Sequence, residues 1–270
     1  MTMIQVNGAE LWVEDTGGSG EAVLLSHGLL WSGRMFEAQV AALRDRYRVI
    51  TWDHRGQGRS APAAERVVSI ETVTADAIAL IEQLGVAPVH FCGLSMGGFV
   101  GMRIAARRPE LVRSLVLMET TADPEPAENV PKYRRLAFVA EWFGLRLVAD
   151  PVMKIMFSRT FLADPAREAD RARWRGELIA NQRDIVAAVR GVIEREGVYE
   201  ELAKIHCPTL VIVGDEDTAT VPAKAERIRA AVRGATLVRV PGAGHSSSVE
   251  QPALVSQIIG SFLDELTRIG

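Results

Sequence analysis

A serine between glycines is the clearest chemical feature of the sequence. Ser95 lies in the hexapeptide GLSMGG, residues 93–98, which directly follows the apolar run 89–92. The apolar run, the glycine-rich turn and the helical spacing of residues 99–108 predict a strand, a sharp turn and a helix, with the serine at the turn. Gly93 and Gly97 suit a serine whose backbone is strained and closely packed. The following helix would direct its positive dipole end toward the reacting atom, so this serine is typical of a nucleophile.

A histidine near the end of the chain is a candidate general base. The serine hydroxyl is a weak nucleophile at neutral pH, so an imidazole must take its proton during attack and return it to the leaving group. His245 lies in the glycine-containing segment 241–246, directly after the strand-like run 236–240. It is the only one of the five histidines C-terminal to the acidic segment described next. We therefore predict that His245 serves Ser95 as its base.

An acidic segment follows the strand-like run 210–213. We predict that Asp217 in this segment orients the imidazole and stabilises its charged form. The neighbouring Asp215 and Glu216 are alternatives, and so are two carboxylates that follow an earlier strand, Glu119 and Asp123.

The chain order of these three residues is informative. The order Ser95, Asp217, His245 matches that of the α/β-hydrolases and differs from those of the chymotrypsin and subtilisin families. The segment HGL, residues 27–29, follows the strand-like run 23–26 and is similar to the first oxyanion loop of the α/β-hydrolases. The turn 53–60 and the stretch 214–222 also resemble landmarks of that family. The sequence thus resembles an α/β-hydrolase over nearly its whole length.

This resemblance implies two further site groups. In relatives, the backbone amide of the residue after His-Gly joins the amide that follows the nucleophile, and the two bind the oxyanion. Carried over to this sequence, the donors are the amides of Leu29 and Met96. The resemblance implies neither a cofactor nor a metal.

Short apolar runs alternate with helical patterns along most of the chain. Residues 23–26, 49–52, 89–92, 115–118, 210–213 and 237–240 read as buried strands, and residues 70–84 read as one of the helices between them. This alternation predicts an α/β fold with a mostly parallel, doubly wound sheet. Asn7-Gly8 between two alternating runs predicts a hairpin at an antiparallel edge. All three candidate residues then follow the carboxyl ends of strands, where open α/β sheets place their sites.

The interval 121–206 breaks the alternation, because it has helical spacing and no strand-like run. We predict a helical cap over these residues, inserted into an α/β-hydrolase core formed by residues 1–120 and 207–270. Such a cap covers the carboxyl ends of the strands, and its apolar side chains can line the substrate pocket. We expect substrate contacts from Trp142, Met153 and Phe157 of the cap and from Trp31 after the oxyanion loop.

The composition excludes several classes of protein. The 270 residues carry a formal charge of −3, which gives no electrostatic basis for binding nucleic acid or an anionic membrane surface. The N-terminus lacks the basic and apolar regions of a signal peptide, and no stretch has transmembrane length, so a cytoplasmic location is expected. With 48% apolar residues, the chain can bury one substantial core.

These observations predict a cofactor-free serine hydrolase that cleaves small carboxylic esters or lactones through an acyl-enzyme. The sequence resembles the small esterases and 3-oxoadipate enol-lactonases of the family. Carbon–carbon bond hydrolases and perhydrolases of the same fold use the same residues and remain alternatives. A non-catalytic protein that holds a small ligand in the same pocket is a rival from another class.

Overall fold

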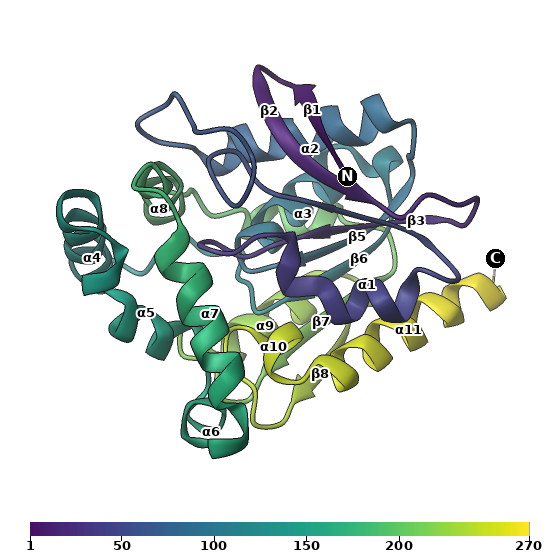
Figure 1. Ribbon diagram of the computed structural model, residues 1–270. Helices are drawn as coiled ribbons and strands as arrows, with labels where there is room; N and C mark the ends of the chain where they lie inside the picture. Colours follow the sequence, from purple (N-terminus) through teal and green to yellow (C-terminus); the bar gives the residue numbers. More distant parts are fainter. Residues whose placement is uncertain (270) are drawn as a thin grey trace.

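The computed structural model describes residues 1–269, which are built around an eight-stranded sheet (Figure 1). The strands follow the order β1-β2-β4-β3-β5-β6-β7-β8 across the sheet. Their bounds are β1 Thr2–Val6, β2 Ala9–Asp15, β3 Ala22–Ser26, β4 Arg48–Trp52, β5 Val89–Leu94, β6 Val112–Met118, β7 Thr209–Gly214 and β8 Thr236–Val240.

An antiparallel hairpin forms one edge of the sheet. β1 pairs antiparallel with β2, and β2 pairs antiparallel with β4. The turn between β1 and β2 places Asn7 at φ 46° and Gly8 at φ 74°, a conformation that asparagine and glycine tolerate best. All remaining strand pairs are parallel. The predicted mostly parallel α/β sheet is therefore confirmed.

Helices cover both faces of the sheet, which explains why its central strands are mostly apolar. In β6, Leu115 and Leu117 join an apolar cluster with α2 (Ile70–Leu84), α3 (Met96–Arg107) and α9 (Pro222–Ala231). Val116 and Met118 point to the opposite face, into a cluster that includes side chains of α1 (Glu37–Leu43) and α11 (Pro252–Ile269). Figure 1 shows α2 and α3 on one side of the sheet and α1 and α11 on the other.

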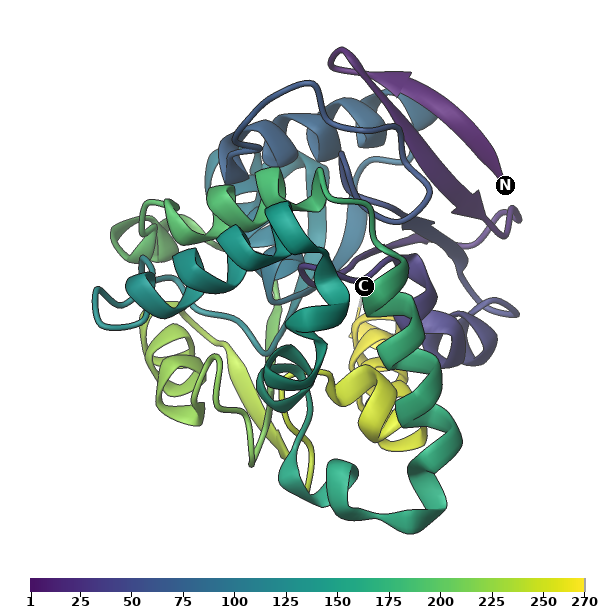
Figure 2. The same cartoon turned by 60° about the vertical axis from the view of Figure 1, so that its left-hand side comes forward.

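A strand-free insertion lies between β6 and β7. It contains α4 (Val130–Phe143), α5 (Ala149–Met156), α6 (Arg159–Ala163), α7 (Glu168–Ala180) and α8 (Ile185–Ile193). These teal and green helices lie in front of the sheet in Figure 2. They occupy the interval for which the sequence predicts a cap.

The strand order reverses its direction at β3, which pairs with β4 on one side and with β5 on the other. Ligand sites in open α/β sheets form outside the carboxyl ends of the strands at such a reversal. The loops after β3 and β5 are therefore brought together there, beneath the inserted helices.

Residues 1–269 contain neither a membrane-spanning helix nor a cluster of metal-binding side chains. No helix there is both long and apolar enough to cross a membrane. No group of three or more histidine, cysteine, aspartate or glutamate side chains in that range is placed to hold a metal ion.

Candidate active site

Ser95 occupies a strained position in the turn between β5 and α3. Its φ of 51° and ψ of −109° place a non-glycine residue in a sparsely populated region, which costs about 1–3 kcal/mol. Two hydrogen bonds hold the residue there. The Ser95 amide donates to the Met118 carbonyl at 2.8 Å, and the Thr120 hydroxyl donates to the Ser95 carbonyl at 2.9 Å. The neighbouring strand β6 thus stabilises the strained turn.

The glycines on either side of Ser95 are required by close packing. A Cβ atom on Gly97 would lie 2.0 Å from the carbonyl oxygen of Ser26 in β3. A Cβ atom on Gly93 would lie 2.3 Å from the carbonyl oxygen of Gly97. Any side chain at either position would therefore displace the turn that presents Ser95.

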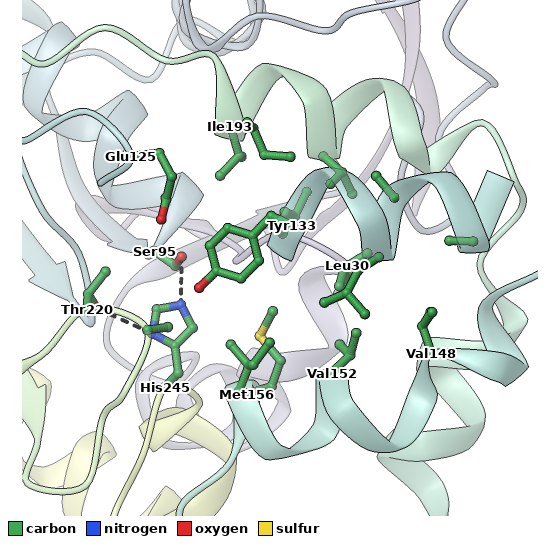
Figure 3. Close-up of a pocket in the computed structure, with 18 of the residues that line it drawn as sticks. Leu30, Ser95, Glu125, Tyr133, Val148, Val152, Met156, Ile193, Thr220 and His245 are labelled. Atoms are coloured by element: carbon green, nitrogen blue, oxygen red, sulfur yellow. Dashed lines mark hydrogen bonds between the residues drawn. The ribbon is translucent and has the colours of Figure 1, made fainter. Parts of the chain in front are cut away.

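The structure brings the three predicted residues together in one hydrogen-bonded chain. Ser95 Oγ lies 2.8 Å from His245 Nε2, and His245 Nδ1 lies 2.9 Å from Asp217 Oδ2 (Figure 3). Because the carboxylate accepts a hydrogen bond from Nδ1–H, Nε2 is left to accept the serine proton. Ser95, Asp217 and His245 are all buried.

Asp217 is held as an ionised acceptor. Its Oδ1 accepts from the amides of Ala219 and Thr220 at 2.8 and 3.0 Å, and its Oδ2 accepts from the Thr220 hydroxyl at 2.7 Å. Burial alone would raise the pKa of Asp217, but the adjacent His245 and the Thr220 donors outweigh it and lower the pKa below 3.8. A permanently negative group therefore faces the imidazole.

The other acids near these strands make different contacts. Three of the alternative acids are exposed or half-buried, and none of them bonds to His245. Asp215 accepts from Arg239 at 2.5 Å, Glu216 accepts from Thr160 at 2.5 Å, and Asp123 accepts from Lys224 at 2.6 Å. Glu119 is fully buried, and neither of its carboxyl oxygens has a hydrogen-bond partner in the described chain. Asp217 is thus the acid that the geometry selects.

Two backbone amides near Ser95 are free to bind an oxyanion. Within residues 1–269, neither the Leu29 amide nor the Met96 amide donates a hydrogen bond to another protein group. Met96 is the first residue of α3, and the first amides of a helix lack partners within it. Leu29 lines the same cavity as Ser95.

The turn after β4 fixes the loop that carries Leu29. The Leu30 amide donates to Gln57 Oε1 at 3.0 Å, and the His54 amide donates to His27 Nε2 at 2.9 Å. The rings of His27 and His54 stack with centroids 3.9 Å apart. Both histidines are fully buried, and burial lowers their pKa values, so they are neutral structural groups.

A cavity of about 120 Å³ opens beside Ser95 and His245. The side chains that line it come mainly from α4, α5 and α8, and Figure 3 shows them around the serine and the histidine. On α4 the lining residues recur at helical spacing: Tyr133, Leu136, Ala137 and Ala140. One face of the insertion therefore forms the wall of the cavity.

Comparison with known proteins decides the family. Residues 21–252 match the family described as the alpha/beta hydrolase fold. The chain belongs to the α/β-hydrolase family. The predicted resemblance is confirmed, and the hydrolase class is established with it.

Relatives of this α/β-hydrolase have related activities in their names. A protein of Variovorax paradoxus named "Putative carbamate hydrolase RutD" is 30% identical, and the alignment covers 93% of each chain. An esterase from Thermogutta terrifontis is 30% identical with a TM-score of 0.88, covering 98% of this chain and 97% of that one. The enol-lactonase from Burkholderia xenovorans LB400 is 29% identical with a TM-score of 0.90, covering 97% of this chain and all of that one.

The structure of this α/β-hydrolase places the four predicted substrate contacts outside the lining of the cavity. The cavity-lining residues do not include any of the four predicted contacts, which are Trp31, Trp142, Met153 and Phe157. Trp142 lies on the outer face of α4 with 63% of its surface exposed, whereas Met153 and Phe157 are buried in the apolar core. Trp31 packs edge-on against Phe157 and Trp174 with ring centroids 5.8 and 5.3 Å away. Most of the wall consists of smaller aliphatic side chains and Met156, with Phe99 and Tyr133 as its aromatic members.

The sequence analysis also missed a residue that positions the histidine loop. Glu250, at the end of α10 (Ser247–Glu250), is buried. It accepts hydrogen bonds from the amides of Gly244 and Ser246, on either side of His245, at 3.0 and 3.1 Å. It also accepts from the amide of Ser158 in the insertion at 2.9 Å. Nothing in the local sequence distinguishes this glutamate from a surface residue.

Replacing Asp217 or Asp123 by asparagine distinguishes the roles of these two candidate acids. We expect Asp217→Asn to lower kcat for a p-nitrophenyl ester by about 10⁴-fold, because an amide in place of the carboxylate favours the wrong imidazole tautomer. Asp123→Asn should leave kcat within about threefold, since Asp123 pairs with Lys224 away from His245. Steady-state release of p-nitrophenolate measures both. Near-normal turnover by Asp217→Asn would show that another acid orients the histidine.

Glu119 gives a prediction about stability. Burial, reinforced by the negative charge of Asp217, raises the pKa of Glu119 well above its ordinary value of 4.5. Above that value the unfolded chain releases the proton while the folded chain keeps it. The free energy of unfolding therefore falls as pH rises, by about 1.4 kcal/mol per pH unit, until the folded pKa is reached.

Glutamine has no proton to release, so Glu119→Gln should become more stable relative to the wild type as the pH is raised from about 5 to about 7. Urea unfolding of both proteins at the two pH values measures the difference. A stability difference that does not change with pH would mean that Glu119 is ionised in the folded protein.

Proposed function

We propose that this protein hydrolyses carboxylic esters or lactones through an acyl-enzyme on Ser95. The observation that carries the proposal is the hydrogen-bonded chain from Ser95 through His245 to Asp217, with the serine at the cavity. The free amides of Leu29 and Met96 support it, because acyl transfer requires donors for a developing oxyanion.

In the proposed reaction, Ser95 Oγ bonds to the substrate carbonyl carbon while His245 Nε2 takes the hydroxyl proton. The carbonyl oxygen becomes an oxyanion at the amides of Leu29 and Met96, which are worth a few kcal/mol in the transition state. The C–O bond to the alcohol then breaks, and His245 returns the proton to the leaving oxygen. Water attacks the acyl-enzyme by the same sequence, releasing the acid and regenerating Ser95.

The names of the similar proteins support an ester or lactone substrate, since they include an esterase and an enol-lactonase at about 30% identity. A carbamate is the second candidate, because a relative at the same identity is named as a carbamate hydrolase. Both substrates offer the same carbonyl to the serine and differ in the group beside it.

The proposal is tested with p-nitrophenyl esters from acetate to decanoate, a simple lactone and a p-nitrophenyl carbamate, each with Ser95→Ala in parallel. We expect turnover that depends on Ser95 and an optimum among the shorter acyl chains, because the cavity is only about 120 Å³. Turnover of the carbamate alone would move the assignment to the second candidate. Tight binding without turnover of any substrate would contradict the proposal and favour a ligand-binding protein.

A further inference from the structure

The cavity beside Ser95 has one pair of charged residues in a mostly apolar wall. Glu125 and Arg195 line it near the serine, while the remaining lining of α5 and α8 is aliphatic or Met156. Figure 3 shows the Glu125 carboxyl on one side of Ser95 and the Tyr133 hydroxyl directed toward Ser95 and His245. These polar groups are therefore placed to contact the substrate group that occupies the cavity.

The two charges are paired with each other, although Arg195 Nε has no hydrogen-bond partner in the described chain. Arg195 Nη1 donates to Glu125 Oε2 at 2.8 Å and to the Val192 carbonyl at 2.8 Å. The second carboxyl oxygen of Glu125 accepts from Asn129 Nδ2 at 3.1 Å. The side chains of Arg195 and Glu125 are only 3% and 9% exposed, and the guanidinium lies over the Phe99 ring at 4.5 Å. Because Arg195 and Glu125 form an ion pair with each other, together they add no net charge to the cavity.

No other cation of the described chain is available at this wall. Arg195 is the only lysine or arginine among the cavity-lining residues of the described chain. Arg103, which lies behind it, donates to Glu71 at 2.7 Å and to two backbone carbonyls. Asp217 adds a negative charge behind His245. A carboxylate entering the cavity would lose its hydration and find no unpaired cation, while Asp217 adds a negative charge nearby.

We propose that the cavity selects substrates whose cavity-bound group is uncharged, and that Glu125 determines this specificity by holding Arg195. This inference rests on the proposed function, because it names the substrate class of the same site. Without the Glu125 charge, Arg195 would offer its cation to a substrate carboxylate, which guanidinium binds well.

The test uses pairs of esters that differ only by a carboxylate or a carboxamide. One pair carries the difference on the acyl side, in mono-p-nitrophenyl adipate and its adipamide counterpart. The other carries it on the alcohol side, in 4-acetoxybenzoate and 4-acetoxybenzamide. For the pair whose variable group enters the cavity, we expect the wild type to favour the carboxamide at least about tenfold in kcat/KM.

Glu125→Gln preserves the shape of the side chain and removes its charge. We expect this variant to reduce that preference about tenfold, measured as the ratio of kcat/KM for the carboxamide to that for the carboxylate. Glu141→Gln is the matched control, since Glu141 of α4 pairs with Arg190 of α8 at 2.6 Å without lining the cavity. It should retain the wild-type preference.

Equal or better wild-type turnover of both carboxylates would overturn the inference, and this result does not depend on the folding of any variant. An unchanged preference in folded Glu125→Gln would remove Glu125 as its determinant. Equilibrium dialysis of Ser95→Ala with the same compounds separates binding from chemistry. Stronger binding of the carboxamide would uphold the selectivity even if no ester were hydrolysed, and equal binding would overturn it.

Discussion

Replacing Ser95 by alanine is expected to lower kcat/KM for a p-nitrophenyl ester by about a thousandfold to a millionfold. The variant loses the atom that would bond to the substrate, so acyl-enzyme formation is impossible and only the oxyanion donors and binding remain. The protein should stay folded, because the side chain of Ser95 faces the cavity and its backbone bonds to Met118 and Thr120 remain. Release of p-nitrophenolate measures the loss, and thermal unfolding provides the control.

Residual turnover near the wild-type rate in a folded Ser95→Ala protein would exclude the serine as nucleophile. The strained turn would then need another explanation, since its φ of 51° is stabilised by the surrounding residues and has no structural benefit of its own.

Replacing His245 by alanine is expected to cause a loss of similar size. Ser95 Oγ has its only side-chain hydrogen bond in the described chain to His245 Nε2, at 2.8 Å, so no other group is placed to take its proton. Because serine and histidine act as one unit, Ser95→Ala/His245→Ala should be no more than about threefold slower than the slower single variant. The same assay with all three proteins measures this.

Losses that multiply in the double variant would contradict the account, because they would mean that the two residues act independently. A loss in His245→Ala alone that reverses at alkaline pH would agree with it, since hydroxide can then replace the missing base.

The sequence was sufficient to predict that the three residues lie together, because each one follows the end of a strand by a few residues. Ser95 comes one residue after β5, Asp217 three residues after β7 and His245 five residues after β8. The carboxyl ends of parallel strands meet at one edge of the sheet, so chain order and strand position together bring these side chains close. The apolar runs identify the strands reliably because helices cover both faces of the sheet.

The sequence does not fix which residues line the cavity, because the lining depends on the rotation of α4 about its axis. Ala140 faces the cavity and Trp142, two residues later, faces solvent. Helical spacing identifies the two faces but does not say which one covers the sheet. Apolar side chains of the cap and Trp31 were expected at the substrate, whereas in the structure Trp31 and Phe157 pack against each other in the apolar core.

The sequence alone could not predict residues whose roles depend on partners far away in the chain. Glu125 and Arg195 are 70 positions apart, and their pairing depends on the arrangement of the inserted helices. Glu250 reaches Ser158 across 92 positions. Neither contact follows from a local pattern, because a charged residue in a helical segment is usually exposed.

The central claim is that Ser95 forms a covalent bond with the reacting centre of the substrate. Diethyl p-nitrophenyl phosphate tests it most directly, because an activated serine displaces p-nitrophenolate from phosphorus and retains the diethylphosphoryl group. After incubation, mass spectrometry of the intact protein and of its peptides should find one such group, on Ser95, and none on Ser95→Ala or His245→Ala. Modification of another residue, or none under conditions that label a known serine esterase, would contradict the account.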